Sequence, residues 1–211
     1  MEARPRVLVA CEESGTVVDA FKRRWGESFE VYSCDLLPTS GKHPDVHIQV
    51  DALELIKMEF DLLLGFPPCT HLAVSGARYF EEKRANGKQD MAIGFFKALW
   101  SADIPHICIE NPVGIMSSEI GKPTQVINPW QFGHPEQKKT CLWLKDLPPL
   151  QPTKDVYEEM MALPKGKRER ILSMSPSPER ARERSVTYRG VADAMSDQWG
   201  RYLLEGPHTL F

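Results

Sequence analysis

Short apolar runs alternate with stretches of helical spacing along the first 145 residues of the chain. Each run contains β-branched or aromatic residues and ends at a polar residue or at Gly or Pro, as buried strands do. Between the runs, apolar residues recur at helical spacing, most clearly at 17–21 and 91–100. We therefore expect an α/β fold with a doubly wound, mainly parallel sheet and helices on both faces. The expected strands are 7–10, 31–33, 46–50, 60–64, 106–109 and 141–144.

The composition is that of a soluble globular protein. The 211 residues are 42% hydrophobic and 26% charged, with a net charge of -3. A disordered chain has fewer apolar residues and a larger charge imbalance. A membrane-spanning helix needs about 20 consecutive apolar residues, which the sequence lacks. The apolar run at 7–10 is too short for a secretory signal. We expect one domain over residues 1–211, in the cytoplasm and without a membrane partner.

The five cysteines are scattered singly, so neither a C-x-x-C metal motif nor a disulfide framework is indicated. His43 and His47 are separated by Pro44 and no third ligand follows, so we expect no metal site. Four cysteines lie in or beside apolar runs, as small buried thiols do, whereas Cys69 follows two prolines. The five are Cys11, Cys34, Cys69, Cys108 and Cys141.

The composition of the sequence changes after Trp143, where prolines become frequent. We expect a short helix at 156–163 and a last helix at 188–204 that returns the chain to the core. Residues 165–184 contain seven basic residues against three acidic ones. Such a run is usually a solvated loop, which charge alone favours here, and a phosphate-contacting arm is the alternative. The region at about 145–185 is therefore a short basic insertion.

Polar residues follow four of the expected strands. Asp35, Asp51, Cys69 and Glu110 come after the second, third, fourth and fifth strands. Ligands of open α/β sheets bind beyond the carboxyl ends of the strands. A single Asp after a strand is more often a turn residue or a helix cap. The four together predict a site at this edge of the sheet.

The first strand and its turn, residues 7–15, have the place of a nucleotide-binding loop without its G-x-G-x-x-G pattern. Phosphate cradling is therefore not expected. Asp35, about 20 residues past this turn, can accept hydrogen bonds from both hydroxyls of a ribose. With Glu12 and Glu13 the pocket is acidic, so it suits a cationic ligand such as a sulfonium cofactor better than a polyphosphate.

Cys69 is a candidate nucleophile because the two prolines before it hold the thiol on a rigid turn. The thiolate is the reactive form and needs an electropositive setting. A Cys/His hydrolase pair with His71 is a weak alternative, since it also needs a third, orienting group. Candidate cations are Arg78, Lys138 and Lys139.

Two blocks of sequence lie at the expected site in a recognisable order. Residues 65–69 read Gly-Phe-Pro-Pro-Cys and are followed by Gly76, and residues 109–112 read Ile-Glu-Asn-Pro. The first block resembles the G-G-P-P-C-Q-x-F-S-x-A-G block of the DNA cytosine-5 methyltransferases, and the second resembles the E-N-V block of that family. Among the departures from the first block, Thr70, Leu72 and Ala73 replace its Gln, Phe and Ser.

Two further blocks are more distantly similar to the same family. Residues 137–141 are similar to its Q-x-R-x-R strand, with Lys139 where the first Arg stands. Residues 9–15 resemble its F-x-G-x-G-G loop in position and in Gly15. The resemblance covers residues 6–145 and, more faintly, the helix at 188–204.

The resemblance implies a Rossmann-like domain of the class I methyltransferase type that transfers a methyl group from S-adenosyl-L-methionine to carbon 5 of cytosine in DNA. In that chemistry the Cys69 thiolate adds to ring carbon 6, and Glu110 hydrogen-bonds or protonates N3. Lys139 would contact the pyrimidine carbonyl or a phosphate. Asp35 would hold the cofactor ribose and Asp51 the adenine amino group. The implied cofactor-binding residues are Cys11, Glu12, Ser14, Gly15, Asp35, Asp51 and Pro67.

The partner implied by the resemblance is DNA with a flipped or single-stranded cytosine, because a base inside a duplex is inaccessible. Phosphate contacts offset the free energy of flipping, so the resemblance favours the phosphate-contacting arm. The family usually carries a larger target-recognition region than residues 145–185 provide. The chain therefore resembles its compact, phage-type members, in the cytoplasm of a bacterium or a phage-infected host. The expected DNA-binding residues are Lys165, Lys167, Arg168 and Arg170.

Two other functions fit the same residues. One is a one-carbon modification of a free pyrimidine nucleotide by the same Cys69 and Glu110 chemistry, which the short recognition region favours. The other is a catalytically silent homologue that binds DNA or cofactor, since the glycine loop and the Arg motif both depart from the family.

Overall fold

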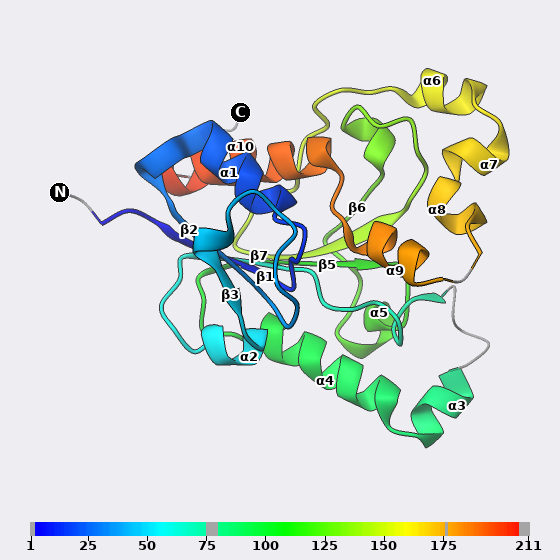
Figure 1. Cartoon of the computed structure of the whole chain (residues 1–211), viewed down its shortest axis with the longest axis horizontal. Helices are drawn as coiled ribbons and strands as arrows, with labels where there is room; N and C mark the ends of the chain where they lie inside the picture. Colours follow the sequence, from blue (N-terminus) through cyan, green and yellow to red (C-terminus); the bar gives the residue numbers. More distant parts are fainter. Residues whose placement is uncertain (1–2, 75–79, 176, 207–211) are drawn as a thin grey trace.

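A single seven-stranded sheet organises the molecule in the computed structural model, which describes residues 3–74, 80–175 and 177–206 (Figure 1). Gly76 and Arg78 lie outside the described residues. The strand order is β3-β2-β1-β4-β5-β7-β6. Neighbours from β3 to β5 are parallel, whereas β7 is antiparallel to both β5 and β6. The strands are β1 (Arg6–Ala10), β2 (Glu30–Asp35), β3 (His47–Gln49), β4 (Leu62–Gly65), β5 (His106–Pro112), β6 (Gln125–Ile127) and β7 (Thr140–Lys145).

Helices cover both faces of the sheet (Figure 1). Along β1, alternate side chains point to opposite faces. Val7 packs with Phe21 and Trp199 on one face, and Leu8 packs with Phe96 on the other. The expected doubly wound α/β fold is confirmed. The first face carries α1 (Thr16–Trp25) and α10 (Arg189–Glu205), and the second carries α2 (Ala52–Leu55) and α4 (Lys88–Trp100).

All six expected strands are present, and β6 is a seventh that the sequence did not indicate. β7 lies between β5 and β6, with Thr140 opposite Pro112 and Lys145 opposite Ile107. Because β7 is antiparallel, its first residue lies at the edge where β5 ends. The residues before β7 are thereby carried to the predicted site.

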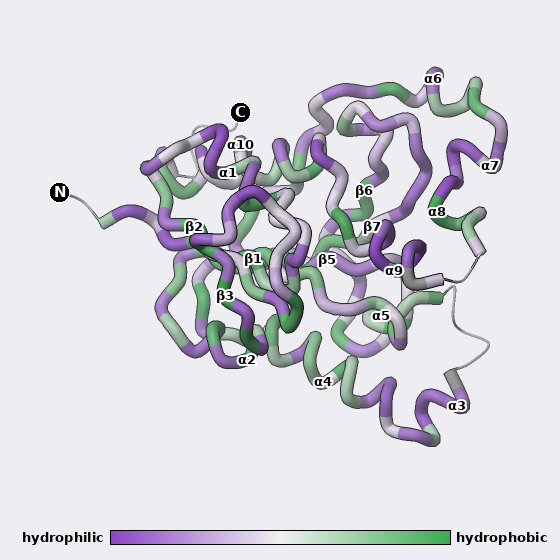
Figure 2. Tube along the Cα trace, viewed as in Figure 1, coloured by the Kyte–Doolittle hydropathy of each residue, from purple (hydrophilic) through white to green (hydrophobic). Residues whose placement is uncertain are grey.

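The basic insertion consists of four short helices between β7 and α10. Figure 2 shows that the tube through α7 and α9 is mostly hydrophilic, whereas the sheet is hydrophobic. In Figure 1, α6 to α8 lie at the periphery and α9 lies beside the end of the sheet. These helices are α6 (Tyr157–Ala162), α7 (Lys165–Arg168), α8 (Arg170–Ser173) and α9 (Pro178–Ser185).

The remaining elements are short. They are α3 (Phe80–Ala85), α5 (Met116–Glu119) and the 3-10 helices η1 (Gly26–Ser28), η2 (Pro44–Val46) and η4 (Pro129–Gln131). Across the ranges that the structure describes, a helix both long enough and apolar enough to cross a bilayer is not found.

Candidate active site

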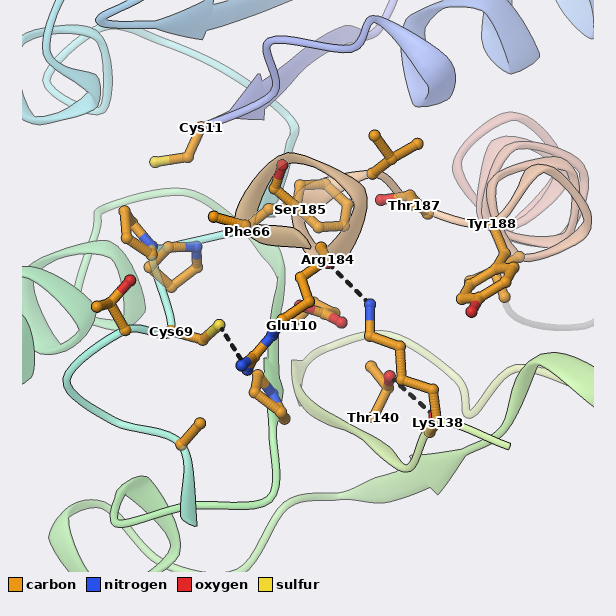
Figure 3. A pocket seen from close by; sticks show the side chains of 18 of the residues that line it. Cys11, Phe66, Cys69, Glu110, Lys138, Thr140, Arg184, Ser185, Thr187 and Tyr188 are labelled. Atoms are coloured by element: carbon orange, nitrogen blue, oxygen red, sulfur yellow. Dashed lines mark hydrogen bonds between the residues drawn. The ribbon is translucent and has the colours of Figure 1, made fainter. Parts of the chain in front are cut away.

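A cavity of about 540 Å³ opens at the carboxyl edge of the sheet (Figure 3). Five predicted site residues line it, from the ends of β1, β2, β4 and β5. The antiparallel β7 adds Thr140 and the preceding Lys138 to the same lining. The predicted residues that meet here are Cys11, Asp35, Pro67, Cys69 and Glu110.

The turn that carries Cys69 is tied to the segment after β5. The buried side chain of Asn111 donates from Nδ2 to the carbonyl oxygen of Pro67 over 3.0 Å. The Leu72 amide donates to the Cys69 carbonyl at 3.1 Å, and the Ile115 amide donates to the Leu72 carbonyl at 2.9 Å. Asn111 is the residue after Glu110, so one strand end positions both candidate catalytic groups.

Glu110 lies near the carboxyl end of β5, on the wall of the cavity. Burial raises the pKa of its carboxyl group, while Lys138, Thr140 and Arg184 act in the opposite direction. The carboxyl group therefore keeps its proton to a higher pH than an exposed glutamate does. A proton donor for a ring nitrogen requires this property.

Arg184, on α9, reaches across the cavity to the candidate nucleophile. Its Nη2 donates to Cys69 Sγ over 3.2 Å. Lys138 Nζ donates to the Arg184 carbonyl oxygen at 2.9 Å, and both contacts are drawn in Figure 3. No sequence pattern pointed to Arg184 beyond its membership of the basic run. The insertion is thus part of the pocket wall.

Of the two neighbouring lysines before β7, Lys138 and not the predicted Lys139 lies at the cavity. Lys139 is exposed and does not line the cavity, whereas Lys138 does. Successive side chains on an extended segment point to opposite sides, so Lys138 and Thr140 share the pocket side and Lys139 does not. Lys138 Nζ also lies 5.6 Å from the centroid of the Tyr188 ring.

His71 is not placed as a base for Cys69. It does not line the cavity, and its buried Nδ1 has no hydrogen-bond partner among the described residues. Burial, with the nearby Lys83 and Lys88, lowers the pKa of its imidazole. The hydrolase alternative therefore has no support from the geometry. Nor do the described residues contain a group of three or more His, Cys, Asp or Glu side chains suited to a metal ion.

Comparison with solved structures identifies the architecture. EhMeth, a methyltransferase of Entamoeba histolytica, is similar with a TM-score of 0.53 at 15% identity, over 73% of this chain and 58% of that chain. The chain has a Rossmann-like α/β fold. A proposed DNA modification methyltransferase encoded within a prophage of E. coli is similar with a TM-score of 0.46 at 18% identity, over 76% of this chain and 56% of that chain. The chain thus spans somewhat more than half the length of either structure. No family model and no curated protein sequence matches the chain.

At the end of the cavity beyond β1 and β2, the side chains can be tested for their fit to the nucleoside part of S-adenosyl-L-methionine. Asp35 ends β2, and its Oδ1 accepts from the Leu37 amide at 2.9 Å. A carboxylate offers further acceptor sites, so Asp35 fits a ribose diol. Phe66 and Pro67 add apolar surface to the same lining, and Cys11 directly follows β1 with a left-handed backbone at φ 62°. An acceptor for ribose hydroxyls beside apolar surface fits a nucleoside.

Two residues predicted to hold the cofactor are helix caps instead. The buried Glu12 carboxylate accepts from the Val17 amide at 2.5 Å, at the start of α1. Asp51 is exposed, and its Oδ1 accepts from the Leu53 amide at 2.9 Å, at the start of α2. Neither side chain lines the cavity. Each instead supplies an acceptor to an amide in the first turn of a helix, where the amides lack partners within the helix.

Ser14 and Gly15 line a second cavity of about 550 Å³. The two cavities share Thr187 and Tyr188 in their linings, so they adjoin. Gly15 has φ 64°, and a Cβ there would lie 3.1 Å from the Gly41 backbone, which explains the need for glycine. Of the seven predicted cofactor residues, three therefore line the first cavity, Ser14 and Gly15 line the second, and Glu12 and Asp51 line neither.

The four predicted DNA-binding residues differ in their surroundings. Lys165 and Lys167 are exposed on α7, and Arg168 is half-buried. Arg170 forms ion pairs with Glu136, at 3.2 Å, and with Glu183. Arg170 is engaged within the protein, whereas the two lysines present their charge to solvent.

Proposed function

We propose that the chain is an S-adenosylmethionine-dependent enzyme that methylates carbon 5 of cytosine in DNA through a covalent Cys69 adduct. One observation carries the proposal: the Cys69 thiol and the Glu110 carboxyl group, from the ends of adjacent strands, line the same cavity. Asp35 and Cys11 line its other end. The cavity therefore accommodates a ring between a nucleophile and an acid, beside a place for a methyl donor.

The first chemical step activates a poor nucleophile. Carbon 5 of a pyrimidine does not attack a methyl group unaided. When the Cys69 sulfur bonds to carbon 6, the π electrons of the C5–C6 double bond shift toward carbon 5 and N3. Glu110 transfers its proton to N3, which neutralises the developing charge. The raised pKa of Glu110 supports this role, because the acid is available nearer neutral pH.

The remaining steps return the protein to its starting state. When bound, S-adenosyl-L-methionine supplies an electrophilic methyl group, and Asp35, Cys11 and Pro67 are the residues that would hold it. After carbon 5 carries the methyl group, transfer of its proton to a water molecule restores the C5–C6 double bond and breaks the Sγ–C6 bond. The departing electron pair regenerates the Cys69 thiolate, and N3 returns its proton to Glu110.

Methyl transfer with Cys69→Ser tests the proposal. With radiolabelled S-adenosylmethionine, we expect the wild type to label DNA and the variant to show no transfer above background. Cofactor affinity should change by less than about twofold, since Ser retains the shape of the side chain and the cofactor end lies elsewhere. DNA containing 5-fluorocytosine should trap a covalent adduct with the wild type only, because fluorine cannot leave as the carbon 5 proton does.

Other outcomes assign the alternatives. Labelling of dCMP without labelling of DNA identifies a nucleotide-modifying enzyme. Cofactor binding by a wild type that forms neither product nor adduct identifies a silent homologue. Equal loss of cofactor binding and transfer in Cys69→Ser means that Cys69 is structural.

A further inference from the structure

The basic insertion delivers a fixed positive charge to the candidate nucleophile. Figure 3 shows the Arg184 side chain running from α9 past Glu110 to Cys69. The Nη2 to Sγ distance is 3.2 Å, within the range of a hydrogen bond to sulfur. Cys69 and Arg184 are 115 residues apart in sequence, so this contact depends on how the insertion packs.

Several polar contacts hold α9 in the position that makes this approach possible. Lys138 Nζ donates to the carbonyl oxygen of Arg184 itself, at 2.9 Å. The preceding residue, Glu183, is paired with Arg170 of α8. One turn earlier, Arg180 Nε donates to the Ile171 carbonyl oxygen at 3.0 Å. Helix α9 is thus held on one side by Lys138, just before β7, and on the other by Arg170 and Ile171 of α8.

We propose that Arg184 is a catalytic residue that stabilises Cys69 as the thiolate. A guanidinium keeps its proton throughout the accessible pH range, and its hydrogen bond to an ionised acceptor is about twice as strong as that to a neutral one. The ionised form of the thiol is therefore favoured beside Arg184. The inference rests on the proposed nucleophilic role of Cys69, and it gives the insertion a part in the chemistry as well as in DNA binding.

Charge balance in the cavity supports this assignment. Glu110 lies on β5, which pairs with β4, the strand before the turn that carries Cys69. An ionised thiol close to another acidic group is stabilised by a nearby cation. Arg184 acts electrostatically on Glu110 as well as bonding to Cys69. Arg184 therefore acts on both groups: it bonds to Cys69, and it opposes the retention of the Glu110 proton that burial favours. The other charged or titratable groups that line the cavity are Cys11, Asp35, Lys83, Lys138, Arg180 and Tyr188.

The test is the pH dependence of Cys69 alkylation by iodoacetamide, without cofactor or DNA, with modification at Cys69 measured by mass spectrometry. In Arg184→Ala and Arg184→Gln we expect the pH profile of the alkylation rate to move toward higher pH, because the cation that bonds to the sulfur is gone. At neutral pH the alkylation rate falls because less of the thiol is ionised. The fall is limited to roughly threefold to tenfold, because a more basic thiolate is also more nucleophilic. Arg184→Lys restores part of the shift.

Arg182→Ala is the matched control. Arg182 is an exposed cation on the same helix and does not line the cavity, so its removal should leave the midpoint unchanged. A change in access to the thiol alters the rate equally at every pH, whereas removal of the thiolate partner moves the midpoint. If Arg184→Ala fails to fold, Arg184→Gln, which keeps most of the side-chain volume, decides.

The outcomes separate this inference from the proposed function. An unchanged midpoint in folded Arg184→Gln, with methyl transfer by the wild type, overturns the role of Arg184 alone. A shifted midpoint in a protein that transfers no methyl group upholds the role of Arg184 and overturns the proposed function.

Discussion

At the scale of single residues, the proposed reaction depends on Glu110, an acid that retains its proton because it is buried. Burial raises the pKa of Glu110 while Lys138, Thr140 and Arg184 oppose the shift. In the proposed reaction the protonated form is the useful one, because N3 receives a proton as the thiolate adds. The rate of methyl transfer should therefore fall as pH rises through the pKa of Glu110 in the complex.

Glu110→Gln removes this proton while preserving the shape of the side chain. We expect the single-turnover rate of methyl transfer to DNA to fall by roughly 10² to 10⁴-fold, the usual contribution of a positioned general acid. The alkaline decline of the wild-type rate should be absent from the variant. Cofactor affinity serves as the control and should be unchanged. A variant rate within about threefold of the wild type would show that Glu110 only shapes the cavity.

The sequence was informative about residues that end strands and uninformative about residues brought in from afar. Cys69 and Glu110 were predicted because the strand-end rule needs only local patterns. Arg184 was not, because its role depends on the packing of α9, and a cation in a charged run usually faces solvent. Lys139 was chosen over Lys138 because a motif match ignores which way the side chains of an extended segment alternate.

At the scale of elements, the turn from β1 into α1 replaces a glycine-rich loop with a buried acid. Glu12 accepts from the Val17 amide, and burial raises the pKa of its carboxyl group to about 8. An unfolded glutamate ionises near its ordinary pKa. Between about pH 5 and about pH 8 the folded state therefore holds a proton that the unfolded state has released, so stability falls as pH rises.

Glu12→Gln tests this account of the turn. The amide oxygen of Gln can still accept from the Val17 amide, but it does not ionise. In the wild type the free energy of unfolding should decrease by about 1.4 kcal/mol per pH unit across this window, and the variant should lack that contribution. Urea denaturation at several pH values measures both slopes. Glu13→Gln, the adjacent acid, should keep the wild-type slope, and a wild-type slope in Glu12→Gln would contradict the assignment.

Elements with a strong apolar pattern were predicted, and those without one were missed. The helices α1 and α10 pack against the β1 face through residues that the periodicity had indicated, including Phe21 and Trp199. β6 has only three residues, too few to show a period. The caps formed by Glu12 and Asp51 were not predicted for another reason: an acid after a strand can bind a ligand or cap the next helix, and its neighbours in space are needed to see the cap.

At the scale of the whole molecule, one reversed strand decides what the cavity contains. β7 pairs with β5 in the antiparallel sense, so Thr140 and Lys138 reach the same edge as Glu110. Lys138 in turn bonds to α9, which brings Arg184 to Cys69. Strand direction is set by pairing between segments distant in sequence. The pattern of apolar runs therefore indicated a mainly parallel sheet but not which strand was reversed.

The surface charge of the insertion leads to a prediction about DNA binding. Lys165 and Lys167 are exposed, whereas Arg170 is paired with Glu136 and Glu183. Removing one lysine–phosphate interaction should reduce the slope of log affinity against log salt concentration by about 0.9 on duplex DNA and about 0.7 on a single strand. The double variant Lys165→Ala and Lys167→Ala should therefore flatten the slope by up to twice these amounts.

Arg170→Ala should act through the protein rather than through DNA. This substitution removes the partner of Glu183, which precedes Arg184, and so removes one of the contacts that hold α9. The rate of Cys69 alkylation should therefore change, while the slope of log affinity against log salt concentration changes little. Lys57→Ala, at an exposed lysine after α2, is the control and should leave both measurements unaltered. Fluorescence anisotropy with a short duplex at several salt concentrations gives the slopes. If the double lysine variant keeps the wild-type slope, α7 is a solvated surface and the prediction that Lys165 and Lys167 contact DNA is wrong.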